Sequence, residues 1–209
     1  MKLFLVLTGL ALGSAMFGAT IVTPNGSPNA GSEISNTEVM AVRFTLGAAY
    51  NNVAISASLS SFATGETGTS YLTNSLGAGT TVANQVGSAN FSYTTVANFT
   101  TLVNVPLFSG LSLGAGTYNV VFTTVGNGHS NFVSRLAGGT YTTAPGTTAS
   151  AFFTNSPSGY APASTFSALN YQELFFTVTG DPVIPEPSTL GLFATGAGAL
   201  WMARRRLRN

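Results

Sequence analysis

The 209-residue chain contains no cysteine, one histidine and one aspartate. The absence of cysteine excludes disulfides, zinc–thiolate sites, thiol catalysis and cysteine-ligated iron–sulfur clusters. Charged residues make up only 6% of the chain, so its solubility has to come from Ser, Thr, Asn and Gly. We therefore expect no metal site and no cofactor.

Basic residues are almost absent from the middle of the chain. Between residues 20 and 182 the only cations are Arg43 and Arg135, against four glutamates and Asp181. No basic patch is available to neutralise phosphates, so the composition disfavours nucleic-acid binding. The remaining basic residues lie at the two ends of the chain.

A serine-hydrolase triad is not predicted. His129 lies in a Gly- and Asn-rich turn, no Gly-x-Ser-x-Gly elbow occurs, and we place Asp181 in a linker after the last strand. The pattern is typical of a solvated loop histidine rather than a catalytic base.

A glycosidase would need two carboxylates about 5 to 9.5 Å apart. The candidates are Glu33, Glu38, Glu66 and Glu173, and nothing in their spacing brings two of them together. A glycoside hydrolase is therefore the least favoured function.

Hydrophobic residues alternate with polar ones at a period of two, which indicates strands. This pattern predicts strands over residues 40–46 and 53–59, with residues 47–51 as a hairpin loop. Further strands are expected over 99–105, 107–111, 117–123 and 173–179, with a tight reversal over 113–116. No convincing helical period occurs between residues 20 and 182, so we predict an all-β, antiparallel two-sheet sandwich, jelly-roll-like, as one domain.

Two segments of this domain are rich in turn residues. Residues 23–37 are expected to be an irregular lead-in, preceded by a short edge strand near Ile21 and Val22. Residues 138–160 are expected to form a long surface excursion.

Residues 1–19 have the pattern of a secretory signal peptide. Lys2 precedes an apolar run from Leu3 to Leu12, which is too short for a transmembrane anchor. Small residues then offer two cleavage sites, after Ala15 or after Ala19, and the sequence does not decide between them.

The other end, residues 183–209, has three successive parts. Pro185, Glu186 and Pro187 form a stiff, extended triplet. The hydrophobic stretch 188–203 would span roughly 24 Å as a helix, which is short against a hydrocarbon core of about 30 Å. The chain then ends with a basic cluster that should stay in the cytoplasm, made of Arg204, Arg205, Arg206 and Arg208.

This order of triplet, short membrane helix and basic end resembles the PEP-CTERM family of exported proteins from Gram-negative bacteria that also make extracellular polysaccharide. The resemblance implies recognition of Pro185, Glu186 and Pro187 by an exosortase, a membrane cysteine protease. It also implies transient anchoring in the inner membrane with the body on the periplasmic side, followed by transfer to the cell surface or extracellular matrix.

The sequence leaves two functions open for the body. The first is a non-enzymatic surface or biofilm-matrix protein. The second is a carbohydrate-binding module for exopolysaccharide, with Tyr141 and Tyr160 as candidates for stacking on sugar rings. Against the second, the single tryptophan, Trp201, lies in the tail and not in the body.

Overall fold

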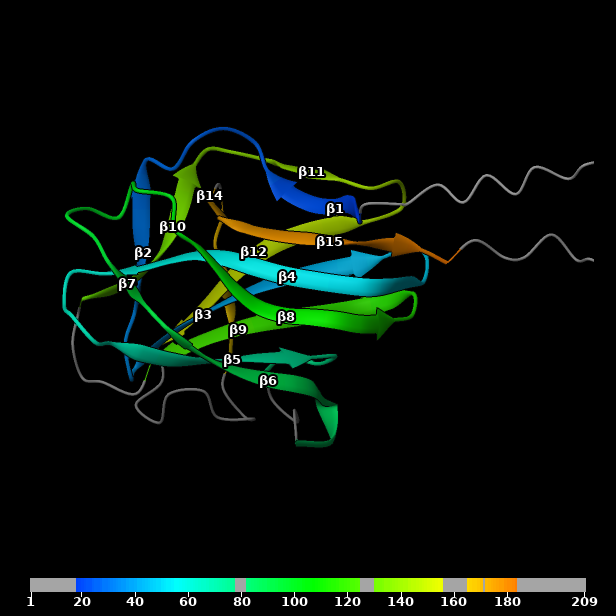
Figure 1. Cartoon of the computed structure of the whole chain (residues 1–209), viewed down its shortest axis with the longest axis horizontal. Coiled ribbons are helices and arrows are strands. Elements are labelled where there is room, and N and C mark those ends of the chain that lie inside the picture. The colour runs from blue at the N-terminus through cyan, green and yellow to red at the C-terminus, as the bar shows by residue number, and fades with distance from the viewer. Residues whose placement is uncertain (1–17, 78–81, 125–129, 156–164, 171, 184–209) are drawn as a thin grey trace, which may run out of the picture.

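Most of the described chain forms β-strands, which assemble into two sheets (Figure 1). The computed structural model describes residues 18–77, 82–124, 130–155, 165–170 and 172–183. All strand pairs in this part of the chain are antiparallel except β4 with β7. The predicted all-β, two-sheet fold is confirmed, while jelly-roll connectivity stays a prediction.

The first sheet contains nine of the described strands, in the order β11-β1-β15-β4-β10-β14, with β2 beside β10 and with β7 and β8 beside β4. Their bounds are β1 Ala19–Pro24, β2 Ala30–Ile34, β4 Tyr50–Ser61, β7 Thr94–Thr95, β8 Asn104–Leu113, β10 Asn131–Ala137, β11 Tyr141–Thr143, β14 Gln172–Leu174 and β15 Phe176–Pro182.

The second sheet contains six of the described strands, in the order β13-β12-β3-β9-β5-β6. Their bounds are β3 Glu38–Leu46, β5 Thr67–Thr73, β6 Gln85–Ser92, β9 Gly116–Thr124, β12 Thr148–Asn155 and β13 Ser167–Ala168. A short 3₁₀ turn, η1 Val82–Asn84, precedes β6.

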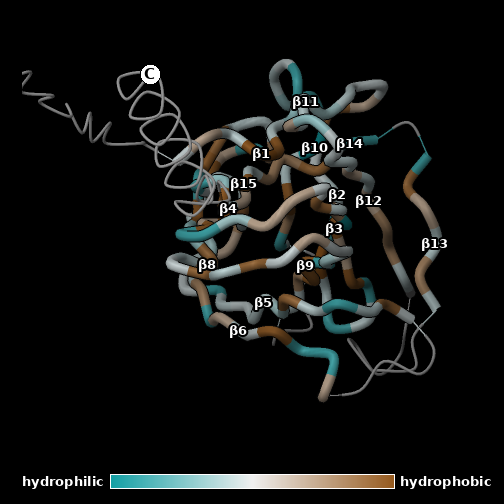
Figure 2. Tube along the Cα trace, turned by 90° about the vertical axis from the view of Figure 1, so that its right-hand side faces the viewer, coloured by the Kyte–Doolittle hydropathy of each residue, from teal (hydrophilic) through white to brown (hydrophobic). Residues whose placement is uncertain are grey.

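The core lies between the two sheets. In Figure 2, β15, β4 and β8 of the first sheet lie on the left of the body, and β12, β3 and β9 of the second sheet lie to their right. Phe44 of β3 and Phe176 of β15 are both almost fully buried, and their ring centroids lie 6.3 Å apart across the interface. Burying large apolar side chains from both inner faces is the main stabilising term for such a fold.

Two short connections cross between the sheets. β3 and β4 are joined by residues 47–49, yet β3 pairs with β9 and β12, whereas β4 pairs with β15 and β8. The hairpin predicted over residues 40–59 is therefore wrong. The tight reversal predicted over residues 113–116 is present, because only residues 114 and 115 separate β8 from β9, and it joins strands of different sheets. Period two marks a strand, but it does not say which neighbour completes its hydrogen bonds.

The two turn-rich segments contain regular strands. Residues 23–37 include β2, which pairs with β10, and residues 138–160 include β11 and the whole of β12, which pairs with β3. The strand near Ile21 is present as β1, but it lies between β11 and β15 rather than at an edge. In these segments long-range pairing overrides weak local propensity, because small and polar residues still supply backbone donors and acceptors.

Two further boundaries differ from the prediction. Residues 99–103 are not a strand, and β8 begins only at Asn104. The strand predicted over 173–179 is divided at Phe175 into β14, which pairs with β10, and β15, which pairs with β1 and β4. Asp181, expected in a linker, lies within β15.

Strand β4 is the centre of the first sheet, and each of its edges binds two strands in succession. One edge pairs with β15 and then with β10, and the other pairs with β8 and then with β7. Ser58 lies where the partners change and is only 4% exposed. Its hydroxyl donates to Ser134 Oγ (3.0 Å) and accepts the Val103 amide (3.0 Å). The Ser58 side chain therefore satisfies polar groups that the strand ladders leave unpaired.

We expect Ser58→Ala to lower the free energy of unfolding by about 1–3 kcal/mol, because the Val103 amide would lose its buried acceptor. Urea unfolding followed by circular dichroism measures this effect. Ser56→Ala is the matched control on the same strand, since Ser56 is only half-buried and should change stability by less than about 0.5 kcal/mol. Equal effects of the two substitutions would contradict the role given to Ser58.

Candidate functional site

The two ends of the described chain leave the body side by side. Ala19, the first residue of β1, pairs with Gly180 of β15. At the end of β15 the Val183 amide donates to the Ala49 carbonyl (3.0 Å). Residues before Ala19 and after Val183 therefore begin at the same end of the sandwich, shown at the right of Figure 1.

The start of β1 bears on the two predicted cleavage sites. Cleavage after Ala15 would leave β1 whole, whereas cleavage after Ala19 would remove its first residue and make Thr20, the partner of Thr179, the new terminus. Ile21 and Val22 are fully buried, so either site leaves the buried part of β1 in place.

Tyr141, a predicted stacking residue, is half-buried at the start of β11. Its ring packs edge-on against Phe176, with centroids 5.4 Å apart. Its hydroxyl donates to the Leu174 carbonyl (3.0 Å) and accepts the Leu174 amide (2.9 Å). Burial raises the pKa of the Tyr141 phenol, so it stays protonated as this hydrogen bond requires. The side chain thus joins β11 to β14.

Glu173 lies next to this link, on β14. Its Oε2 atom is buried without a hydrogen-bond partner among the described residues, although the side chain as a whole is only half-buried. Gly139 covers it closely, since a Cβ there would lie 2.9 Å from Oε2. Desolvation raises the pKa of the Glu173 carboxyl.

The other carboxylates serve different parts of the fold. Glu66 accepts a hydrogen bond from the buried Asn131 amide (3.3 Å), and Asp181 accepts one from Asn52 (2.8 Å). Glu33 lies on β2 and Glu38 begins β3. Within the described ranges no three His, Asp or Glu side chains gather in a way that could hold a metal ion.

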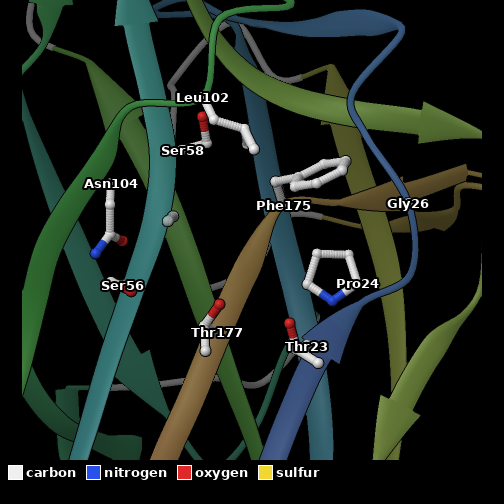
Figure 3. Close-up of a pocket in the computed structure, with 10 residues that line it drawn as sticks. Thr23, Pro24, Gly26, Ser56, Ser58, Leu102, Asn104, Phe175 and Thr177 are labelled. Atoms are coloured by element: carbon white, nitrogen blue, oxygen red, sulfur yellow. The ribbon is translucent and has the colours of Figure 1, made fainter.

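A pocket of about 320 Å³ lies on the outer face of the first sheet, over β1, β15 and β4 (Figure 3). Side chains from four separate segments line it. Its hydroxyl and amide groups come from Thr23, Ser56, Asn104 and Thr177, and its apolar surfaces from Pro24, Leu102 and Phe175. The lining contains no charged side chain.

The polar groups of this pocket are available to a ligand. Ser56 and Thr177 face each other across the β4–β15 pair, and Asn104 faces Ser58 across the β4–β8 pair. Among the described residues no hydrogen bond from the Ser56, Thr177 or Asn104 side chain is formed inside the protein. Leu102, which is 56% exposed, adds an apolar surface beside them. The arrangement suits a neutral molecule with several hydroxyl groups and one apolar face.

No pattern in the sequence predicts this pocket. Its polar residues are common strand residues, separated by up to 154 positions (23 to 177), and no motif connects them. Only the order β1-β15-β4-β8 brings them together.

Several predicted residues lie outside the described ranges: His129, Tyr160, Pro185, Glu186, Pro187, Trp201 and the arginines 204, 205, 206 and 208. Residues 1–17 of the predicted signal peptide and the whole of the predicted transmembrane helix fall there as well. In the part of the chain that is described, no helix has the length and apolar character needed to cross a bilayer.

Comparison with known families identifies the C-terminal segment. Residues 183–206 match the PEP-CTERM protein-sorting motif. The chain carries a PEP-CTERM sorting signal. The predicted resemblance is thereby confirmed for this segment, and the signal implies an exported protein that an exosortase recognises. No curated protein matches the chain.

The PEP-CTERM segment begins directly where the fold ends. Pro182 is the last residue of β15, and Val183 is the first residue of the matched segment. Only Val183 and Ile184 separate the last strand from Pro185. The signal is thus attached to a strand that is hydrogen-bonded on both sides, by β1 and β4.

We expect Glu173→Gln to stabilise the protein at pH 7 but not below pH 4. Because the pKa of Glu173 is raised on folding, the folded protein holds this proton more tightly than the unfolded chain. Stability is therefore lost as the pH rises above the ordinary glutamate value of about 4.3. Melting temperatures measured from pH 3.5 to 7.5 should diverge by a few degrees towards neutral pH. Glu33→Gln controls for loss of one carboxylate, and a constant difference across the pH range would contradict the expectation.

Proposed function

We propose that this chain is a non-enzymatic protein of the cell surface or of the exopolysaccharide matrix, delivered there through its PEP-CTERM signal. The observation that carries the proposal is the position of Ala19 and Val183 at one end of the body, the end at which the signal begins. A body attached at that end presents its opposite end and its sheet faces away from the attachment point.

The proposed route has three steps. A signal peptide directs export, the hydrophobic stretch then holds the body on the periplasmic side of the inner membrane, and an exosortase removes the tail. Arginines 204, 205, 206 and 208 would fix the orientation, because basic residues are retained in the cytoplasm. This route favours the extracellular matrix of a biofilm as the place where the protein acts.

The use of the carboxylates supports the non-enzymatic part of the proposal. Glu66 and Asp181 each accept a hydrogen bond from an asparagine of a neighbouring element, Asn131 and Asn52. A glycoside hydrolase stays a weaker alternative. If the protein were a glycoside hydrolase, Glu66→Gln or Glu173→Gln would remove a measured turnover.

Replacing Pro185, Glu186 and Pro187 together with alanine should keep the protein in the membrane fraction with its Asn209 terminus intact. The physical reason is the loss of the stiff extended segment and its charge, which a protease cleft would bind. Cell fractionation with intact-mass measurement tests this in the native host. Pro182→Ala is the matched proline control outside the triplet and should be processed normally. Normal processing of the triple variant would contradict the route.

A second function, carbohydrate binding, is favoured by the pocket over β1, β15 and β4. Its free hydroxyl and amide groups can exchange hydrogen bonds with sugar hydroxyls, while Leu102 and Pro24 offer apolar contact to the C–H face of a ring. The uncharged lining favours a neutral polysaccharide over one rich in uronic acids. Tyr141 and Tyr160 stay as separate stacking candidates from the sequence, although Tyr141 also holds β14.

Thr177→Val should weaken binding to a neutral polysaccharide about tenfold, the effect of losing one net hydrogen bond of about 1.4 kcal/mol. Affinity electrophoresis of the native protein in gels containing the host's own polysaccharide measures this. Thr179→Val changes the same residue type two positions further along β15, outside the pocket, and should bind like the unchanged protein. Equal binding by all three proteins would exclude this pocket.

A further inference from the structure

The free edges of the two sheets differ in how well they are protected against pairing with another strand. Among the described strands, β7, β11, β13 and β14 have only two or three residues, and β2 carries Glu33. Strand β8 is long, but it contains Pro106, a Gly110 with φ +67° and three shifts of register. Short length, charge, proline and bulges are the usual devices that block edge-to-edge pairing.

Strand β6 has none of these devices along most of its length. It is the last strand of the second sheet and pairs only with β5 among the described strands (Figure 1). Its eight residues, QVGSANFS, include no charge and no proline, and its single irregularity lies at its start, beside Thr73. Val86, the second residue of this strand, is 42% exposed. A regular, uncharged edge of this length is a template for another strand.

We propose that β6 is a self-association edge, on which a second copy of this chain adds its own β6 in antiparallel orientation. The second sheet would then continue from one copy into the other across a twofold axis. In a twofold pair each residue faces the same residue, or one near it in sequence, in the second copy. A charged residue near the axis would therefore lie close to a like charge of the other strand. The uncharged β6 avoids this cost, which favours a second copy over a charged partner.

The burial pattern of β6 fixes the register of such a pair. Val86, Ser88, Asn90 and Ser92 are exposed, whereas Gly87, Ala89 and Phe91 point inward. Residues that face each other in an antiparallel pair lie on the same face of the sheet. The twofold axis must therefore pass between two identical residues that face each other, one from each copy. An axis at Ala89 pairs seven residues, places Gly87 opposite Phe91, and places Ser88 opposite Asn90. Small-to-large pairing of Gly87 with Phe91 makes this register the favoured one.

The direction of β6 also determines where the tails of such a pair would lie. The first residue of β6 pairs with Thr73, and Thr73 also pairs with the first half of β9. Because β9 begins opposite Leu46, β6 begins at the end of the body that holds Ala49 and Val183. Antiparallel pairing therefore places the two Val183 residues, after which the C-terminal segments begin, at opposite ends of the dimer. If the tails hold the protein in a membrane, as the proposed function states, two copies in one membrane cannot pair, and association follows release of the tail.

The cysteine-free chain allows a direct test by single-cysteine cross-linking. Facing Cα atoms in an antiparallel pair are about 4.5–5.5 Å apart, within the range of a disulfide. Ala89→Cys in the full chain, purified in detergent, should form a disulfide-linked dimer on mild oxidation. Ser88→Cys is the matched control, because the two Ser88 positions would be diagonal neighbours about 7–8 Å apart and should cross-link several-fold less.

A second pair of variants keeps the proposal testable if Ala89→Cys does not fold. Ser88→Lys should abolish the concentration-dependent dimer in sedimentation velocity, since it places a charge on the edge. Ser109→Lys, on the interrupted edge β8, should leave the dimer unchanged. A monomer at all concentrations, equal cross-linking at residues 88 and 89, or equal effects of both lysines would overturn the proposal. So would an extended peptide from another protein occupying β6. Because the detergent-purified full chain needs no sorting, these outcomes are independent of the exosortase route.

Discussion

The fold depends on the way that a single strand, β4, satisfies backbone groups on both of its edges. A twelve-residue strand could not be buried without partners along its whole length, because unpaired amides and carbonyls are costly away from water. Four strands share this task, and the hydroxyl of Ser58 fills the place where one pair of partners ends and the next begins. A side chain with one donor and two acceptor sites is suited to that position.

The same arrangement of strands produces both candidate functional features of the body. Because β15 lies between β1 and β4, Val183, the residue at which the PEP-CTERM signal begins, follows a hydrogen-bonded strand directly and is itself hydrogen-bonded to Ala49. Because Thr177 faces Ser56 across that same pair, the outer face of the sheet presents unpaired hydroxyl groups. The attachment of the tail and the candidate glycan pocket therefore share one strand.

Low charge gives this protein two opposite properties. A neutral surface rich in Ser, Thr and Asn can approach a neutral polysaccharide without removing water from ions, which is costly. The same neutrality leaves the edge of β6 without the repulsion that prevents strands from pairing.

Asn52, with φ 51°, lies on β4 and donates to Asp181 of β15, so one of the body's few carboxylates supports the strand from which the tail departs.

Some properties were determined by local sequence alone. Alternation in 40–46 and 117–123 predicted two central strands, since a strand with one buried face needs period two. The PEP-CTERM signal was likewise readable, because its triplet, hydrophobic run and arginines are contiguous. The tertiary structure alone decided that β3 and β4 lie in different sheets, that β2 and β12 are regular strands, and that Thr23, Ser56 and Thr177 line one pocket. The physical reason is that strand partners are chosen by hydrogen bonds and packing between distant residues, which leave no periodic trace in the sequence.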